Sequence, residues 1–164
     1  MKRKHPILWI EDGARFDLPY LAAPVYMDGG YDLFVAETIA DGIAHLQQHE
    51  FDAIIMDIRV PPGADLQWNT LYKDAGRNKV MARLGLKLLY SLLDHSEAEI
   101  KLPAHPDWIN AKKIGVLTVE SYAELKDHLD KLGIKVYQQK HANIEDMVLL
   151  DLIKKVLKNS AEIS

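Results

Sequence analysis

Polar residues of the types that take part in phosphoryl transfer follow four short apolar runs of the chain. Glu11 and Asp12 follow the first run, Asp57 a second, and Thr118 and Lys140 two more. Adjacent carboxylates repel each other unless a cation or a basic side chain lies between them. Hard oxygen ligands of this kind suit Mg²⁺. An aspartate such as Asp57 can act as a carboxylate nucleophile and form an acyl phosphate.

The other two side chains each suit one oxygen of a phosphoryl group. The Thr118 hydroxyl would donate a hydrogen bond, and the Lys140 ammonium would supply a positive charge. Taken singly, each residue has a plain structural interpretation, because Asp also starts turns and adjacent carboxylates can form a solvated acidic turn. The chemical interpretation therefore requires that the fold bring these residues together.

The apolar runs have the form of strands buried on both faces of a parallel sheet. The sequence predicts five strands, at residues 7–10, 31–36, 53–56, 114–117 and 134–137, and five helices, at residues 14–27, 38–49, 84–93, 121–132 and 144–158. This alternation predicts an α/β fold of the flavodoxin-like type, with a five-stranded parallel sheet and helices on both faces. Right-handed crossovers place the carboxyl ends of all strands on one edge, where the polar residues would meet.

Length and composition indicate one globular domain. The chain has 164 residues, of which 48% are hydrophobic, so we expect a single domain over 1–164 with its core at about 7–158. A net charge of −4 gives no reason to expect nucleic acid as a direct partner. The absence of cysteine excludes disulfides and thiolate metal sites. No apolar run is long enough for a membrane span or a signal peptide, which predicts a cytoplasmic protein.

Two connections are longer than usual for a compact domain. The periodic pattern dissolves over residues 62–83, where we expect a loop beside the site, and residues 95–113 are expected to form an extended connection. Pro24 is expected to kink or end the first helix.

The order of these residues resembles the receiver domain of two-component response regulators (CheY-like). The matching positions are Glu11-Asp12, Asp57 with Pro61 four residues later, Thr118, Lys140, and Tyr137 three residues before that lysine. The resemblance covers residues 7–158. It implies a phosphoacceptor that could catalyse its own phosphorylation and dephosphorylation, rather than an enzyme. Asp57 would receive a phosphoryl group from a histidine kinase or a phosphotransfer protein.

The resemblance also implies how the site works. Mg²⁺ would be bound by Glu11, Asp12, Asp57 and the backbone carbonyl of Arg59. Thr118 and Tyr137 would rearrange on phosphorylation and move the face formed by the fourth helix, fifth strand and fifth helix. Because no effector domain follows residue 158, we expect the output to be contact with a downstream protein target. A homodimer through the same face is compatible with the resemblance.

Three features depart from the usual receiver pattern. Val119 follows Thr118 where the family has a small residue, His141 follows Lys140 where it has proline, and residues 62–83 are an insertion. Arg59 and Glu120 each lie two residues beyond an active-site residue. We hypothesise that they face each other, restrict the attack of water and lengthen the lifetime of the phosphoryl group.

Two other functions remain open at this point. The first is a phosphorylation-independent, receiver-like interaction module that binds a protein through residues 62–83 or its last helices. The second is a phosphohydrolase of the haloacid dehalogenase type, which shares a nucleophile at a strand end. That family has a second aspartate two residues after the first, and Arg59 occupies this position here.

Overall fold

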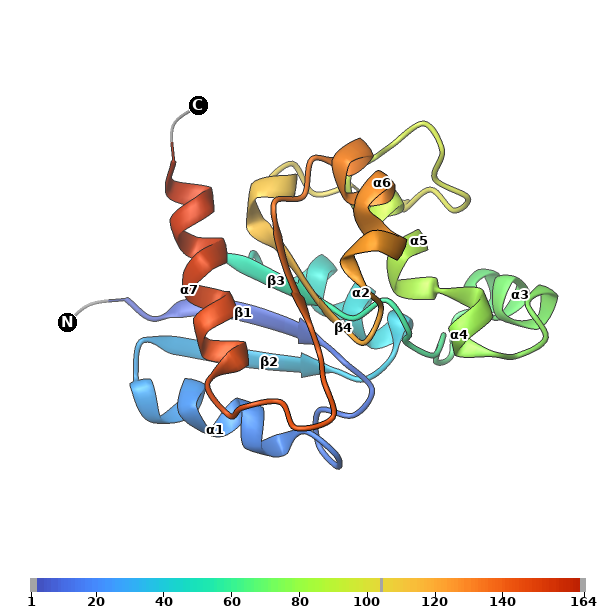
Figure 1. The fold of residues 1–164 in the computed structure, drawn as a ribbon. Helices are drawn as coiled ribbons and strands as arrows, with labels where there is room; N and C mark the ends of the chain where they lie inside the picture. The colour runs from blue at the N-terminus through green and yellow to red at the C-terminus, as the bar shows by residue number, and fades with distance from the viewer. Residues whose placement is uncertain (1–2, 104, 163–164) are drawn as a thin grey trace.

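A computed structural model describes residues 3–103 and 105–162, so that the ends of the predicted 1–164 domain and one residue of the 95–113 connection lie outside the described part. Five parallel strands form one sheet in the order β2-β1-β3-β4-β5 (Figure 1). They are β1 (His5–Ile10), β2 (Tyr31–Ala36), β3 (Ala53–Met56), β4 (Ile114–Thr118) and β5 (Val136–Gln139). This confirms the predicted α/β fold.

Helices cover both faces of the sheet, because alternate side chains of each buried strand point to opposite sides. Ile7 and Trp9 of β1 pack in one core with α1 (Pro19–Asp28) and α7 (Val148–Ala161). Leu8 and Ile10 pack in a second core with α2 (Ile39–Gln48), α5 (Leu84–Leu92) and α6 (Tyr122–Leu132). The helices thus leave the carboxyl edge of the sheet for the polar residues.

The prediction of a loop over residues 62–83 is wrong. This insertion forms α3 (Leu66–Asp74) and α4 (Lys79–Ala82), which lie beyond the strand ends marked by the arrowheads in Figure 1. Asp65 caps α3 by accepting a hydrogen bond from the Trp68 backbone N–H, and Asn78 caps α4 in the same way. The periodicity is too weak to reveal α3 because the helix buries only Trp68.

The structure also corrects several element boundaries. The first helix begins at Pro19 and continues through Pro24 to Asp28, so Pro24 does not end it, and a kink there stays a prediction. Pro24 has no backbone N–H, so the backbone carbonyl of Tyr20, four residues earlier, has no helical donor. Tyr20 lies in the exposed first turn, where water can bind this carbonyl. The strand β4 includes Thr118, and β5 begins two residues later than predicted. The last helix is α7 over Val148–Ala161. The long connection ends in a short 3₁₀ helix, Ala111–Lys113.

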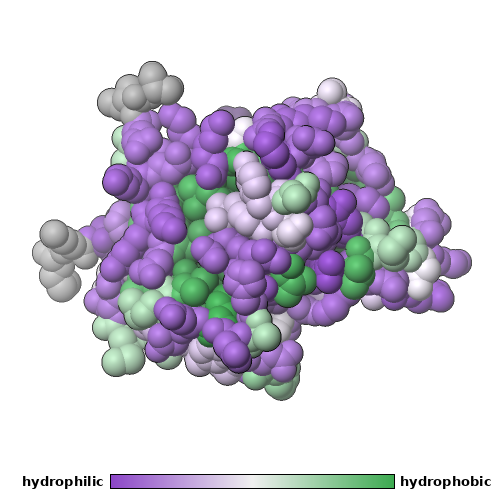
Figure 2. Space-filling view, in the orientation of Figure 1, coloured by the Kyte–Doolittle hydropathy of each residue, from purple (hydrophilic) through white to green (hydrophobic). Residues whose placement is uncertain are grey.

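The surface in Figure 2 is mainly hydrophilic, with smaller apolar areas between the polar side chains. None of the helices within residues 3–103 and 105–162 has the length and apolar character needed to cross a membrane.

Candidate functional site

The carboxyl ends of β1, β3 and β5 bring Glu11, Asp57 and Lys140 together. Lys140 Nζ contacts a carboxylate oxygen of Glu11 and lies 3.2 Å from Asp57 Oδ2. The side chains of Glu11, Asp57 and Lys140 are only 2%, 5% and 10% exposed. Because Glu11 is buried, the acidic pair is not simply a solvated turn.

Sheet hydrogen bonding continues past the strands and fixes these residues. The backbone N–H of Asp57 donates to Ile10 O at 3.0 Å, and that of Lys140 donates to Thr118 O at 2.7 Å. The backbone N–H of Gly13 donates to Glu11 Oε2 at 3.1 Å and orients this carboxylate toward the site. The site is therefore held by the backbone of the sheet edge.

Glu11, Asp12 and Asp57 form a group that could hold a divalent metal ion. One carboxylate oxygen from each lies within 4.8 Å of the others. Burial raises the pKa of Glu11 to about 8; the nearby Asp57 carboxylate adds to this rise and Lys140 opposes it. The hard oxygen donors of this cluster fit a divalent cation. The predicted role of the Arg59 carbonyl as a further ligand stays a prediction.

An open pocket of about 390 Å³ is lined in part by this cluster. Val119 and His141, the two departures from the receiver pattern, both line it. Thr118, in contrast, is fully buried, and its Oγ1 accepts a hydrogen bond from the Glu120 backbone N–H at 3.4 Å. The structure therefore brings the carboxylates of Glu11, Asp12 and Asp57 together with Lys140. The Thr118 hydroxyl stays outside the pocket lining.

Glu120 is a buried carboxylate held by two arginines. Arg59 Nε donates to Glu120 Oε2 at 3.2 Å, so the expected contact between these two residues is present. Arg83 donates to Glu120 Oε1 through Nε at 3.0 Å and Nη2 at 2.7 Å. The Tyr137 hydroxyl donates to the backbone carbonyl of Glu120. Sequence reasoning missed Arg83, because nothing local in the sequence indicates that the end of the insertion returns to this site.

The insertion supplies a second residue that sequence reasoning missed. Lys79 Nζ, on α4, lies 2.5 Å from Asp12 Oδ2. Burial alone would raise the pKa of Asp12, but hydrogen bonds from Lys79 and Glu11, together with the charges of Lys79 and Lys140, outweigh burial and hold this pKa below its usual value. The same hydrogen bond raises the pKa of Lys79. Lys79 and Lys140 thus approach the acidic cluster from different parts of the chain.

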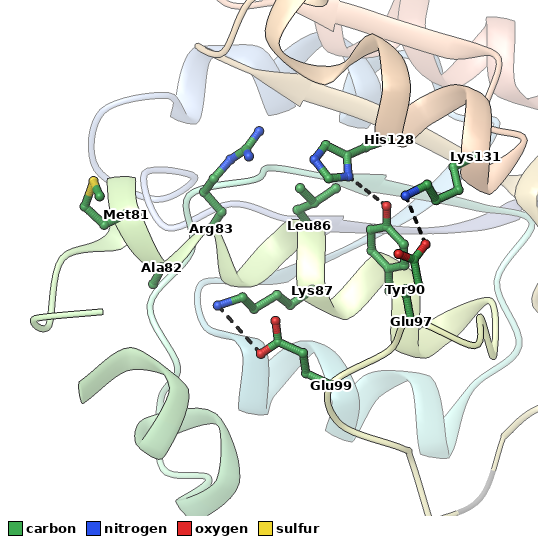
Figure 3. A pocket seen from close by; sticks show the side chains of 10 residues that line it. All are labelled: Met81, Ala82, Arg83, Leu86, Lys87, Tyr90, Glu97, Glu99, His128 and Lys131. Atoms are coloured by element: carbon green, nitrogen blue, oxygen red, sulfur yellow. Dashed lines mark hydrogen bonds and ion pairs between the residues drawn. The ribbon is translucent and has the colours of Figure 1, made fainter. Parts of the chain in front are cut away.

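A second pocket, of about 340 Å³, lies between α5, α6 and the long connection (Figure 3). Tyr90 OH and His128 Nδ1 are 2.7 Å apart within it. Burial, with the charges of Arg83 and Lys131 acting in the same direction, lowers the pKa of His128. In Figure 3 the Arg83 side chain extends away from Lys87. Its guanidinium binds Glu120. Arg83 thus connects this pocket to Glu120, which Arg59 in the lining of the first pocket also binds.

No protein-family model matches the sequence, and no curated protein matches it. Solved structures of response regulators are similar in fold. One from Thermotoga maritima has a TM-score of 0.58 at 14% identity, over 94% of this chain and 98% of that one. One from Burkholderia pseudomallei, with a phosphorylated aspartic acid, a calcium ion and citrate, has a TM-score of 0.59 at 19% identity, over 96% and 69%.

A third similar structure is the chemotaxis response regulator CheY4 of Vibrio cholerae, with a TM-score of 0.55 at 18% identity, over 94% of this chain and 99% of that one. At these identities the similarity concerns the fold. The chain has the fold of a CheY-like receiver domain, as the order of its polar residues suggested. Its acidic cluster fits the metal site of such a domain.

Proposed function

We propose that this protein is a phosphoacceptor of two-component signal transduction, acting in the cytoplasm. Asp57 receives a phosphoryl group from a histidine kinase or a phosphotransfer protein, and the phosphorylated chain signals by contact with a downstream protein. The observation that supports this best is the Lys140 ammonium between the Glu11 and Asp57 carboxylates, at the floor of an open pocket in a receiver fold.

The site supplies the nucleophile and a cationic side chain for the transfer step. A carboxylate oxygen of Asp57 attacks the phosphorus of a phosphohistidine, the phosphorus–nitrogen bond breaks, and the imidazole leaves with the electron pair. Lys140, already 3.2 Å from Asp57, is placed to bind a phosphoryl oxygen. Mg²⁺ bound by Glu11, Asp12, Asp57 and the Arg59 carbonyl would neutralise charge on the transferred group.

The switch would start at Thr118. Its hydroxyl accepts a hydrogen bond from the Glu120 N–H, whereas the Tyr137 hydroxyl donates to the carbonyl of the same Glu120. If the Thr118 hydroxyl turns to a phosphoryl oxygen on Asp57, it leaves Glu120, and the partner of Tyr137 moves as well. We therefore place the output on the surface of α6, β5 and α7, where contact with a target, or a homodimer, would form.

Beryllofluoride with Mg²⁺ mimics a phosphoryl group on an aspartate and tests the switch. We expect saturable, Mg²⁺-dependent NMR shifts at Thr118, Tyr137 and Lys140 that are lost in Asp57→Asn.

A second candidate function is an interaction module that works without phosphorylation. It is favoured by Lys79, which already pairs with Asp12, and it predicts no such shifts in the wild-type protein.

The Arg59–Glu120 pair is proposed to protect the acyl phosphate from water. Replacing Arg59 by alanine removes a guanidinium from the pocket lining and should shorten the lifetime of the phosphoryl group by about fivefold, the equivalent of about 1 kcal/mol. The loss of phosphate from phosphorylated protein can be followed by intact mass. Arg15→Ala, which removes an exposed arginine paired with Glu37, is the matched control. An unchanged lifetime in Arg59→Ala would disprove the protective role.

A further inference from the structure

The insertion places a lysine directly on a predicted metal ligand. Lys79 is the first residue of α4, and its Nζ lies 2.5 Å from Asp12 Oδ2. Asp12 is one of the three carboxylates whose oxygens lie within 4.8 Å of one another. Val80, the next residue of α4, lines the same pocket. The insertion therefore forms part of the wall of the acidic site.

Contacts on both sides of Lys79 hold α4 in this place. The side chain of Asn78 accepts hydrogen bonds from the backbone N–H groups of Val80 and Met81. Ala82 is fully buried, and Arg83 binds the buried Glu120. Because the backbone is fixed on either side of it, Lys79 is held near Asp12 at a high effective concentration.

An ammonium and a divalent cation cannot share the same oxygen of Asp12 without strong repulsion. With Lys140 between Glu11 and Asp57, and Lys79 on Asp12, each of the three carboxylates contacts an ammonium group. A cation that binds to this cluster through the same oxygens must therefore displace at least one lysine. Lys79 is the easier one to displace, because its side chain is 46% exposed whereas that of Lys140 is 10% exposed.

We propose that Lys79 is an internal competitor for the metal site: it occupies Asp12 when no divalent cation is bound and must leave when one binds. The inference rests on the metal site of the proposed function. It makes the insertion a regulator of that site, because the position of α4 sets the affinity for the cation. A protein that draws α4 away from Asp12 would strengthen cation binding without touching the acidic residues.

The competition between Lys79 and a cation for Asp12 should also be visible in the insertion itself. If Lys79 opposes cation binding, then the cation must weaken the hold of Lys79 on Asp12 to the same extent. The helix α4 has only four residues, so the loss of this contact should increase its local opening. Amide hydrogen exchange of Met81 and Ala82 is therefore expected to become faster when Mg²⁺ is added.

The test is a calorimetric Mg²⁺ titration of the wild-type chain and of Lys79→Met, which keeps the length of the side chain and removes its charge. We expect Lys79→Met to bind Mg²⁺ about tenfold more tightly, the equivalent of about 1.4 kcal/mol. Lys73→Met, which removes an exposed lysine from α3 of the same insertion, should bind like the wild type. Raising the salt concentration should reduce the difference between Lys79→Met and wild type, because the pair is partly exposed.

Each other outcome has a definite meaning. Equal Mg²⁺ affinities in Lys79→Met and the wild type, with Asp57 still phosphorylated in both, would overturn this inference and leave the proposed function standing. Weaker binding in Lys79→Met would overturn it as well. If neither protein binds Mg²⁺, both the inference and the Mg²⁺-dependent function are wrong.

Discussion

Replacing Lys140 by methionine is expected to lower the free energy of unfolding by about 3 kcal/mol. The ammonium lies between the buried carboxylates of Glu11 and Asp57, and methionine fills a similar volume without the charge. Removing one partner of a buried ion pair leaves the other charge uncompensated, and here two carboxylates lose the same partner. We expect the lower end of the usual range because Glu11, whose pKa is already raised to about 8, can take up a proton.

Urea denaturation of Lys140→Met and of the control Lys135→Met, an exposed lysine just before β5, would measure this loss. The double variant with Asp57→Asn should recover part of the stability, because one of the two buried charges is gone. Mg²⁺ should also stabilise Lys140→Met more than the wild type, since the cation would supply the missing charge. A loss below about 1 kcal/mol, the level of an exposed pair, would show that Lys140 does not compensate the cluster.

Gly85→Ala is expected to cost at least about 3 kcal/mol of stability, toward the upper limit for overpacked cores. Gly85, in the first turn of α5, donates its backbone N–H to Ile58 O at 2.9 Å. A Cβ at this position would lie 1.9 Å from the backbone oxygen of Asp57 and 2.9 Å from Ile58 Cα. Because these are backbone atoms, relief of the clash requires movement of α5 or of the segment that carries Asp57.

The matched control is Gly42→Ala on α2. There the added Cβ would meet Ile10 Cδ1 at 2.8 Å, the far end of a flexible side chain that can rotate away. The higher helix propensity of alanine should offset part of that strain. Thermal unfolding of both variants measures the difference in their stabilities. Phosphorylation of the Gly85→Ala protein that still folds can be measured alongside. If Gly85→Ala is as stable as Gly42→Ala, then α5 does not pack on Asp57 as described.

The sheet and most of the candidate site could be predicted because they depend on local sequence signals. A strand buried on both faces is a short apolar run, and the topology of parallel sheets places Glu11, Asp57 and Lys140 on one edge. The Arg59–Glu120 contact follows from the same logic, since each residue lies two residues beyond a predicted site residue, Asp57 or Thr118. These predictions needed no knowledge of contacts between distant segments.

The insertion could not be predicted in this way. Helix α3 buries only Trp68 and α4 has four residues, so neither shows a helical apolar stripe. The contacts of Lys79 with Asp12 and of Arg83 with Glu120 join residues far apart in sequence, and such pairings depend on where the insertion folds back. The orientation of the Thr118 hydroxyl is also a tertiary feature that the sequence leaves open.

The most direct test of the central claim is to incubate the protein with Mg²⁺ and a small-molecule acyl or amido phosphate donor, and to locate the phosphate by mass spectrometry. We predict one acid-stable, base-labile acyl phosphate on Asp57, which requires Mg²⁺ and is absent in Asp57→Asn. No incorporation into the wild-type protein, or equal incorporation into Asp57→Asn, would contradict the assignment of Asp57 as a phosphoacceptor.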